Sequence, residues 1–444
     1  DRGDIAIIGY SGRYPQSDDL DEFWEHLLAG DDCIEVVPRE RWDHDQYFSA
    51  DPTREGTVNT KWGGFLRDIS SFDAAFFGIS QREGKLMDPQ ERLFLETVYH
   101  AFEHAGYPRG RLEGTDTAVY VGVMNGLYQL LGAEELTVGN VIDARSTYAA
   151  IANRVSYVFD FHGPSMAVDT MCSSSLTAIH LACEQLRCGG SSLAVAGGVN
   201  VIEHPAKYVF LSEQHFGSTE GKCRAFGDGG DGYVPAEGVG AVILKPLAQA
   251  VADGDVVHAV IRATALNHGG RLHGFTVPNP KAQAALVSSA LDRAQVRAAD
   301  IGYVEAHGTG TVLGDPVEVT GLVNAFTARG FDFGARKLPI GSVKANIGHA
   351  ESSAGIASLS KVLLQMKHRT IVPSIHADPV NPRLMLEKTP LRIVRSLEPW
   401  DVASHPVALI SSFGAGGSNA HMVVSAYEAP PGPAAGEGLR PATA

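Results

Sequence analysis

Cysteine is scarce in this sequence, and no two cysteines are spaced as a C-x-x-C pair. Five cysteines in 444 residues are too few for a disulfide scaffold, and they favour a reducing, cytoplasmic setting. No apolar run approaches the roughly 18–20 residues of a membrane span. A basic, then apolar, then small-residue leader is not found at the start either. We therefore expect neither a membrane-spanning nor a secreted protein.

Basic residues are also fewer than acidic residues. Thirty-six Lys and Arg stand against 51 Asp and Glu, for a formal net charge of −15. A nucleic-acid partner would require a basic face, so this balance argues against one. An acidic protein could still dock on a local basic patch. Hydrophobic residues make up 44% of the chain and charged residues 20%, which is typical of a globular protein rather than a disordered one.

Short apolar runs typical of buried strands alternate with stretches of helical periodicity. Strands are expected at 5–9, 118–122, 193–198 and 240–244, and a helix is expected from Pro89 to His104. Strands that alternate with helices predict an α/β layered fold whose sheet is mostly buried.

The two parts of the chain weakly repeat one pattern. A strand at 165–169 passes through a Cys-Ser-Ser-Ser turn into a helix at 176–186. A strand at 339–343 passes through a Gly/His turn into a helix at 354–366. Each passage runs from a strand through small residues to an apolar helix.

We place the boundary between two halves near residue 255. The N-terminal half is then 1–255 and the C-terminal half 256–428. Residues 429–444 are rich in Pro, Ala and Gly and are interpreted as a linker or a terminus left by cloning.

The sharpest motif surrounds Cys172, in the segment Val-Asp-Thr-Met-Cys-Ser-Ser-Ser-Leu from Val168 to Leu176. It places the cysteine between a buried strand and a helix N-terminus. Unpaired N–H groups and the helix dipole favour an anion there, so we expect a lowered thiol pKa and a nucleophile. The same N–H groups suit a developing oxyanion. The alternative is a small buried structural cysteine.

Two histidines lie in glycine-containing loops that follow strands. His307 lies in the loop from Glu305 to Thr311, and His349 in the loop from Lys344 to Glu351. For either histidine alone, a structural hydrogen-bonding role is the alternative. The first loop lacks the Gly-Lys-Ser/Thr that completes a phosphate loop. Zinc is not expected, because Cys172 and the two histidines show no close ligand spacing.

Taken together, these segments resemble the β-ketoacyl synthase family of thiolase-like condensing enzymes. The other marks, in family order, are 7–9 with 12–15, 72–80, 87–92 and 412–421. The resemblance covers almost the whole chain. It implies two duplicated βαβαβ halves that form a layered α-β-α-β-α sandwich. It also implies a homodimer, and the Gly122 to Gly132 loop is our candidate for a segment that reaches the partner.

Within this family the chain resembles ketosynthase domains of modular type I polyketide synthases, in particular those served by a separate, trans-acting acyltransferase. Segments 232–241 and 267–280 carry this likeness. The chain departs from the group at 271–273, where Arg-Leu-His replaces the common Lys-Thr-Asn, and at 226–231. These departures concern the substrate rather than the reaction. The Asp/Gly run at 226–231 lacks the ligand spacing of a calcium loop.

The resemblance implies two half-reactions. Cys172 takes an acyl chain from the phosphopantetheine arm of an acyl carrier protein, and the N–H groups of Cys172 and Ala415 form the oxyanion hole. A malonyl group on another carrier then loses CO2, and its enolate attacks the Cys172 thioester. His307 and His349, as neutral imidazoles, donate to the malonyl thioester oxygen. The polyketide chain grows by two carbons.

Supporting roles follow from the same resemblance. Lys344 is expected to orient the cluster through a carboxylate, either Glu318 or Glu351, and a plain salt bridge is the alternative. Thr309 and Thr311 are candidates to bind the pantetheine arm, or they are turn-forming hydroxyls.

Three further residues are assigned to the substrate pocket. Asn419 and Phe413 are expected to shape its floor and gate. Met171 is a candidate to set the room around the acyl chain, with core filling as the alternative. The resemblance implies no bound cofactor or metal, because the pantetheine belongs to the carrier. It implies acyl carrier protein and neighbouring synthase domains as partners.

A few residues distinguish this chain from enzymes of the same fold that have other activities. A thiolase uses a second cysteine in its C-terminal half, but the last cysteine here is Cys223. A non-elongating, transacylating ketosynthase commonly loses a catalytic histidine, and a silent partner subunit commonly loses the cysteine. A branching ketosynthase, which performs conjugate addition, would carry the same triad. The sequence leaves branching open, together with the length and substitution of the acyl chain.

Overall fold

The computed structural model describes residues 3–51 and 54–428, so the interpretation of 429–444 lies outside the described residues. Its main strands are β1 (Ile5–Arg13), β4 (Ala118–Gly122), β5 (Ser165–Val168), β6 (Ala194–Asn200), β7 (Gly238–Pro246), β8 (Ala259–His268), β9 (Ile301–Glu305), β10 (Leu338–Gly341), β12 (Leu391–Ile393), β14 (Val407–Phe413) and β15 (Ser418–Ala426). They form one eleven-stranded sheet in the order β12-β10-β9-β14-β15-β8-β1-β7-β6-β4-β5. Two small ladders pair β2 (Glu35–Val36) with β3 (Trp62–Gly63) and β11 (Thr370–Ile371) with β13 (Glu398–Pro399).

The strand arrangement repeats within this sheet. In the set β1-β7-β6-β4-β5 the first two pairings are antiparallel and the last two parallel. The set β8-β15-β14-β9-β10 has the same order and the same senses. A short antiparallel ladder between β1 and β8 joins the two sets, and β12 adds a parallel strand beyond β10.

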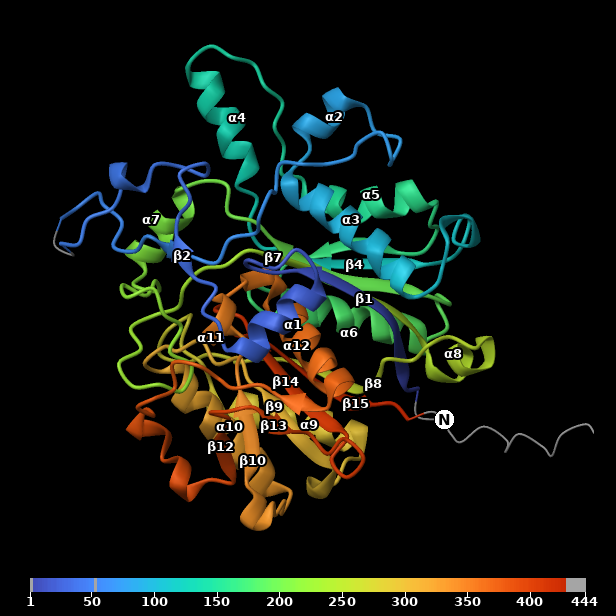
Figure 1. Cartoon of the computed structure of the whole chain (residues 1–444), viewed down its shortest axis with the longest axis vertical. Helices are drawn as coiled ribbons and strands as arrows, with labels where there is room; N and C mark the ends of the chain where they lie inside the picture. Colours follow the sequence, from blue (N-terminus) through green and yellow to red (C-terminus); the bar gives the residue numbers. More distant parts are fainter. Residues whose placement is uncertain (1–2, 52–53, 429–444) are drawn as a thin grey trace, which may run out of the picture.

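Helices complete the layers (Figure 1). They are α1 (Leu20–Ala29), α2 (Gln81–Leu86), α3 (Pro89–His104), α4 (Tyr128–Thr137), α5 (Tyr148–Phe159), α6 (Ser174–Arg187), α7 (Ala206–Glu213), α8 (Leu247–Asp253), α9 (Pro280–Ala294), α10 (Gly314–Ala328), α11 (Lys344–Ile347) and α12 (Ala354–His368). The helices α6 and α12 contact each other and strands of both sets, so they form the middle layer. The outer layers are α3 with α5 on one side and α9 with α10 on the other. The predicted layered α-β-α-β-α fold is confirmed.

The elements form where the sequence predicts them, for recognisable reasons. The helix α3 begins after Asp88, whose carboxylate caps Gln90 N–H, and Pro89 takes the first helical position, where a missing N–H costs nothing. The strand β4 is buried at every residue, as expected for a central parallel strand. Both elements have the predicted bounds.

The middle layer holds the largest apolar core. Leu176 and Ile179 of α6 pack with Ile356 and Leu359 of α12 among buried strand residues of both sets. Burying each such side chain contributes about 1.5–3 kcal/mol. The two halves therefore share one core.

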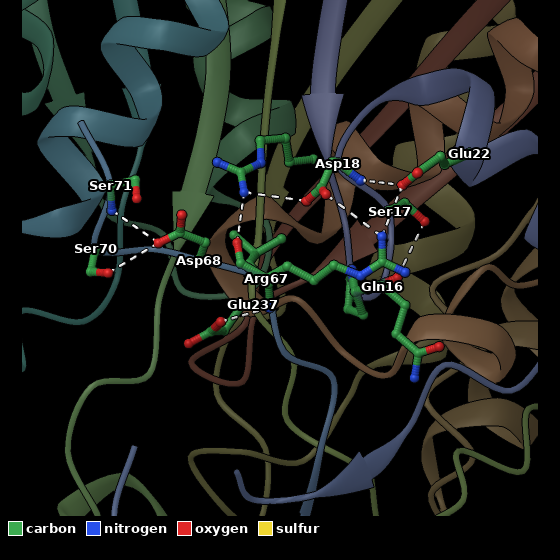
Figure 2. A network of polar contacts seen from close by, with 12 residues as sticks. Gln16, Ser17, Asp18, Glu22, Arg67, Asp68, Ser70, Ser71 and Glu237 are labelled. Carbon is green, nitrogen blue, oxygen red and sulfur yellow. Dashed lines mark hydrogen bonds and ion pairs between the residues drawn. The ribbon is translucent and has the colours of Figure 1, made fainter. Parts of the chain in front are cut away.

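Polar contacts anchor the loops that precede β7. Arg67 pairs with Glu22 of α1 at 3.2 Å. Close by, the buried carboxylate of Glu237 accepts the Leu66 N–H at 2.8 Å and pairs with Arg41 at 2.9 Å. Figure 2 shows Glu22, Arg67 and Glu237 in this network. These bonds tie the segment before β4 to the start of β7.

Candidate active site

The candidate residues collect at the carboxyl ends of the parallel strands. Cys172 follows β5, His307 follows β9, and the segment with Lys344 and His349 follows β10. The turn between β14 and β15 brings Ala415 to the same edge. Loops at the carboxyl ends of parallel strands are the usual place for ligand sites in α/β proteins.

The turn before α6 presents Cys172. The residue before it, Met171, adopts a φ of 58°, which side-chain-bearing residues seldom adopt without outside support. That support is present, because Met171 N–H donates to Asp169 at 2.9 Å and Ser412 Oγ donates to the Cys172 carbonyl at 2.7 Å. Cys172 is buried, so the turn holds the thiol in a fixed place.

The prediction of a lowered Cys172 pKa is wrong. Burial, followed by the Glu351 carboxylate, raises the pKa of the thiol to about 12. Lys207, Lys344 and a hydrogen bond from the Ala415 backbone act in the opposite direction. The helix α6 begins at Ser174, and burial removes the hydration that a thiolate needs. In the free site Cys172 is therefore a neutral thiol.

The His307 ring is held by a backbone donor. Phe413 N–H donates to His307 Nδ1 at 3.4 Å. A neutral imidazole that accepts at Nδ1 carries its proton on Nε2. The His307 and Gly308 N–H groups donate to the Glu318 carboxylate at 2.8 and 2.9 Å. Glu318 thus shapes the loop that carries the ring.

The His349 ring is held in the same way. Glu351 N–H donates to His349 Nδ1 at 3.1 Å, and His349 N–H donates to the Val234 carbonyl at 2.7 Å. The His307 and His349 rings meet edge to face, with centroids 5.3 Å apart. Two Nε2–H donors therefore belong to one small site.

Both histidines are neutral at neutral pH. Burial lowers the pKa of His307 well below its usual value, and the Lys344 charge lowers it further. For His349 the same two causes act, and the His307 and Lys207 charges add to them. Neutral imidazoles are the form that the family resemblance implies.

Lys344 does not bind the carboxylates that were predicted for it. Its ammonium group is buried without a hydrogen-bond partner or ion pair among residues 3–51 and 54–428. Glu318 is occupied by backbone N–H groups, and burial raises its pKa to about 7. Glu351 pairs with Lys207 instead. Burial lowers the pKa of Lys344 itself, while Glu305 and Glu318 oppose this effect.

Residues around Glu351 were missed by the sequence reasoning. Its carboxylate pairs with Lys207, accepts from Asn125 Nδ2 at 2.8 Å and accepts from Tyr233 Oη at 3.0 Å. The Tyr233 ring also packs against His349, with centroids 4.9 Å apart. One signal was available, since Lys207 lies in an otherwise largely uncharged, partly apolar helix, α7. A lysine there needs a buried anion.

The remaining predicted residues lie around this centre. The Phe413 ring lies against His307, with centroids 5.6 Å apart. Thr309 and Thr311 place their hydroxyls 3.2 Å apart in the loop after His307. Asn419 Nδ2 donates to Asn267 at 3.0 Å, one strand over in the sheet.

Two further properties concern metals and membranes. Across the described part of the chain, no group of three or more His, Cys, Asp and Glu side chains is arranged to hold a metal ion. Within the same ranges, no helix combines the length and the apolar character that crossing a bilayer requires.

Comparisons with known proteins agree with this site. Residues 2–250 match the β-ketoacyl synthase N-terminal domain, and residues 258–378 match the β-ketoacyl synthase C-terminal domain. The chain is 56% identical over 425 residues to the polyketide synthase ThaG of Burkholderia thailandensis, which covers 95% of this chain and 8% of ThaG. It is 52% identical over 445 residues to the polyketide synthase PksL of Bacillus subtilis, with coverage of 96% and 10%. The chain thus spans at most 10% of the length of these two relatives.

Solved structures give the same result. The oxazolomycin ketosynthase domain OzmH KS7 of Streptomyces albus superposes with a TM-score of 0.93 at 56% identity, covering 96% of this chain and 75% of the other. The ketosynthase from module 6 of the bacillaene synthase of Bacillus subtilis superposes with a TM-score of 0.89 at 37% identity, covering 96% and 72%. The chain therefore belongs to the β-ketoacyl synthase family, as a ketosynthase domain of the polyketide synthase type, an acyl-transferring enzyme that forms carbon–carbon bonds.

Proposed function

We propose that this domain extends an acyl chain by decarboxylative Claisen condensation with a malonyl group. One observation carries the proposal. The rings of His307 and His349 are neutral, and each accepts a backbone N–H at Nδ1. Both are left with an Nε2–H donor at the sheet edge that also carries Cys172. Two such donors can stabilise the negative oxygen of an enolate. An enzyme that only transfers acyl chains forms no enolate and does not need them.

In the first half-reaction Cys172 attacks the acyl thioester on a carrier protein. The thiol gives up its proton, the sulfur bonds to the acyl carbon, and the pantetheine thiol leaves with a proton. In the free site the backbone N–H of Ala415 donates a hydrogen bond to the sulfur of Cys172. This N–H and the N–H of Cys172 stabilise the negative charge that develops on the carbonyl oxygen of the acyl group when the sulfur attacks its carbon.

In the second half-reaction a malonyl thioester loses CO2. Its C–C bond breaks, the electron pair enters the enolate, and His307 and His349 donate hydrogen bonds to the thioester oxygen. The enolate carbon then attacks the Cys172 thioester. The cysteine leaves as thiolate, takes back a proton, and a β-ketoacyl carrier is released.

The supporting residues receive roles that fit their contacts. Lys344 supplies a buried positive charge that adds to burial in lowering the pKa of both histidines. Glu318 holds the His307 loop through backbone N–H groups. Phe413 gates the site beside His307. Glu351 holds His349, as argued below.

The substrate contacts the site along the loop after His307 and around the turn before Cys172. Thr309 and Thr311 bind the pantetheine arm through paired hydroxyls. Met171 sets the room at the acyl end, and Asn419 with Asn267 forms the floor.

Partners and context follow from the family. The domain works on acyl carrier protein, next to other synthase domains, with a separate acyltransferase as segments 232–241 and 267–280 suggest. It holds no cofactor of its own, because the pantetheine comes with the carrier. The five free cysteines support a cytoplasmic setting. Family matches that end at 250 and resume at 258 support the division near residue 255, with the nucleophile in one half and the histidines in the other.

We also propose a homodimer. Leu136, Val138 and Val141 are exposed on α4 and the loop after it, and α4 projects from the body of the molecule (Figure 1). Met166 is exposed on β5, the edge strand of the sheet. A second copy would cover this apolar surface. Light scattering should give twice the chain mass, and Val141→Asp should shift it toward the monomer.

The test of activity is direct. The domain is loaded with a simple acyl thioester, malonyl carrier is added, and the intact mass of both proteins is followed beside Cys172→Ala. Extension of the carrier by two carbons, with loss of CO2 and dependence on Cys172, supports the proposal. Acylation of Cys172 without extension contradicts it and favours transacylation or branching, which α,β-unsaturated acyl substrates then separate.

A further inference from the structure

The carboxylate of Glu351 lies beside His349 and is held by side chains from three distant segments. Lys207 of α7 forms an ion pair with it, Asn125 donates at 2.8 Å, and Tyr233 donates at 3.0 Å. We call these four residues the Glu351 clamp. We propose that Lys207 is a positioning residue, which through the clamp holds the Glu351 backbone where its N–H keeps the His349 proton on Nε2. This inference rests on the proposed function and adds to it a residue that decarboxylation requires more than acylation does.

The backbone of Glu351 shows why a clamp is needed. Its φ is 48°, in the left-handed region that non-glycine residues occupy only when their surroundings hold them there. The N–H of this same residue donates to His349 Nδ1 at 3.1 Å. A relaxed backbone would turn this N–H away from the ring. Nδ1 could then carry the proton, and Nε2 would become an acceptor.

Burial makes Lys207 the decisive member. The side chains of Lys207 and Glu351 are 3% and 0% exposed. A carboxylate left there without its cation would carry an uncompensated buried charge, which is strongly unfavourable. Asn125 and Tyr233 donate hydrogen bonds but carry no charge. Removing Lys207 therefore favours movement or protonation of the Glu351 carboxylate. Either change disturbs the hydrogen bond from Glu351 N–H to His349 Nδ1.

A purely structural ion pair would affect both half-reactions alike, whereas the clamp should affect one more than the other. Acyl transfer to Cys172 uses the thiol and the oxyanion hole, neither of which contains the Glu351 N–H. Decarboxylation uses the His349 donor. Loss of Lys207 should therefore separate the two half-reactions.

The test compares the intact domain with Lys207→Met and Lys207→Arg. Lys245→Met is the matched control, because Lys245 is also buried and paired with carboxylates, Asp253 and Asp255, outside the site. Cys172 acylation is followed by intact mass and CO2 release from malonyl carrier is followed separately. Melting temperatures are recorded for each variant.

We expect Lys207→Met to slow CO2 release by about 10–100-fold, the range found when a partner that orients a metal-binding histidine is lost. Acylation should slow less, and only because the variant loses the Lys207 charge that lowers the pKa of Cys172. Lys207→Arg should restore most of the CO2 release, and Lys245→Met should behave as the unchanged domain in both assays. The inference is overturned if Lys207→Met releases CO2 at the normal rate, or if both half-reactions fall together in proportion to lost stability.

Two further measurements keep the outcome decisive. If Lys207→Met does not fold, Tyr233→Phe removes one clamp hydroxyl and should slow CO2 release more than acylation, and equal effects would overturn the inference. If the unchanged domain acylates but never decarboxylates, the proposed function fails. The clamp is then judged by 15N NMR of labelled histidine. Lys207→Met should shift the His349 proton from Nε2, and an unchanged tautomer would overturn the inference.

Discussion

The rings of His307 and His349 meet at 84° with centroids 5.3 Å apart, and each accepts a backbone N–H at Nδ1. The donors are Phe413, at the end of β14, and Glu351, after β10. The main chain therefore selects the tautomer of both rings. Two Nε2–H groups offered to one oxygen should act as a unit.

Replacing either histidine should separate the two half-reactions. We expect His307→Ala and His349→Ala each to lower CO2 release by about 10²–10⁴-fold, the usual range for a positioned proton donor. The double variant should lose much less than the product of the single losses. The measurement is CO2 release from malonyl carrier, with acylation of Cys172 as the control. Equal loss of acylation would contradict these roles.

The buried thiol makes acylation depend on pH. Because burial raises the pKa of Cys172 to about 12, the thiolate fraction should rise about tenfold per pH unit across the neutral range. Alkylation of the free domain by iodoacetamide should follow this slope from pH 6 to 9. Quantification of the modified Cys172 peptide separates it from the exposed Cys188. A plateau below pH 8 would show a thiol of ordinary or lowered pKa.

Lys344→Met should make the rate of decarboxylation fall at acidic pH. The Lys344 charge lowers the pKa of both His307 and His349, so its removal raises both values toward 6.5. Each ring would then gain a proton at Nδ1, against the backbone N–H that it accepts. Burial, the larger cause, remains in the variant, so CO2 release should begin to fall at a pH below 6.5 but higher than in the unchanged domain, with Lys344→Arg as the control. Superimposable pH profiles would contradict this role.

Close backbone packing supports the nucleophile turn. A Cβ atom on Gly122 would lie 2.5 Å from the Ser175 backbone nitrogen, whereas one on Gly110 would meet nothing within 4 Å. We expect Gly122→Ala to cost about 1–3 kcal/mol, as overpacking does, and to slow acylation because the start of α6 must move. Gly110→Ala should keep the normal melting temperature and acylation rate. Equal behaviour of the two variants would refute the argument.

A buried histidine outside the site should make the fold sensitive to acid. Burial lowers the pKa of His421 to about 3, while an unfolded histidine titrates near about 6.5. Between these values the unfolded chain binds a proton that the folded chain does not. The contribution is complete above about pH 6.5 and is lost as the pH falls, by up to about 1.4 kcal/mol per unit. Urea unfolding of His421→Asn should show a smaller loss between pH 6.5 and 4, and parallel curves would exclude this cause.

Local patterns predicted an α/β layered fold and several of its elements, and they singled out the residues of the candidate site. The bounds of β4 and α3 follow from apolar runs and from the Asp88-Pro89 start signal. Cys172, His307 and His349 stand out because small residues surround them at the ends of strands. Each of these signals lies within about ten residues of sequence.

Pairings across the site were not predicted. The ion pair of Lys207 with Glu351 joins residues 144 positions apart, and no periodicity connects them. The same limit explains why Glu351 was assigned to Lys344. The raised thiol pKa was missed because a helix N-terminus can be read from sequence, whereas the burial of a sulfur depends on how the halves close over it.

The short ladder between β1 and β8 has a consequence for engineering. Only three residue pairs, from Ile5–Ile261 to Ile7–Ala259, join the two five-strand sets there, but β1 itself belongs to the first set and begins the chain. Exchanging the second half of this domain for that of a relative would keep every ladder within each set intact. The new seam would include those three pairs, the contact of α6 with α12, and the contacts of each helix with strands of the other set. It would also include the Glu351 clamp, because Lys207, Asn125 and Tyr233 lie in the first half and Glu351 in the second. The success of chimeras cut near residue 255 should therefore depend on the fit of the middle helix layer and on an intact Glu351 clamp. A chimera that keeps both would pair the nucleophile of one synthase with the histidines of another.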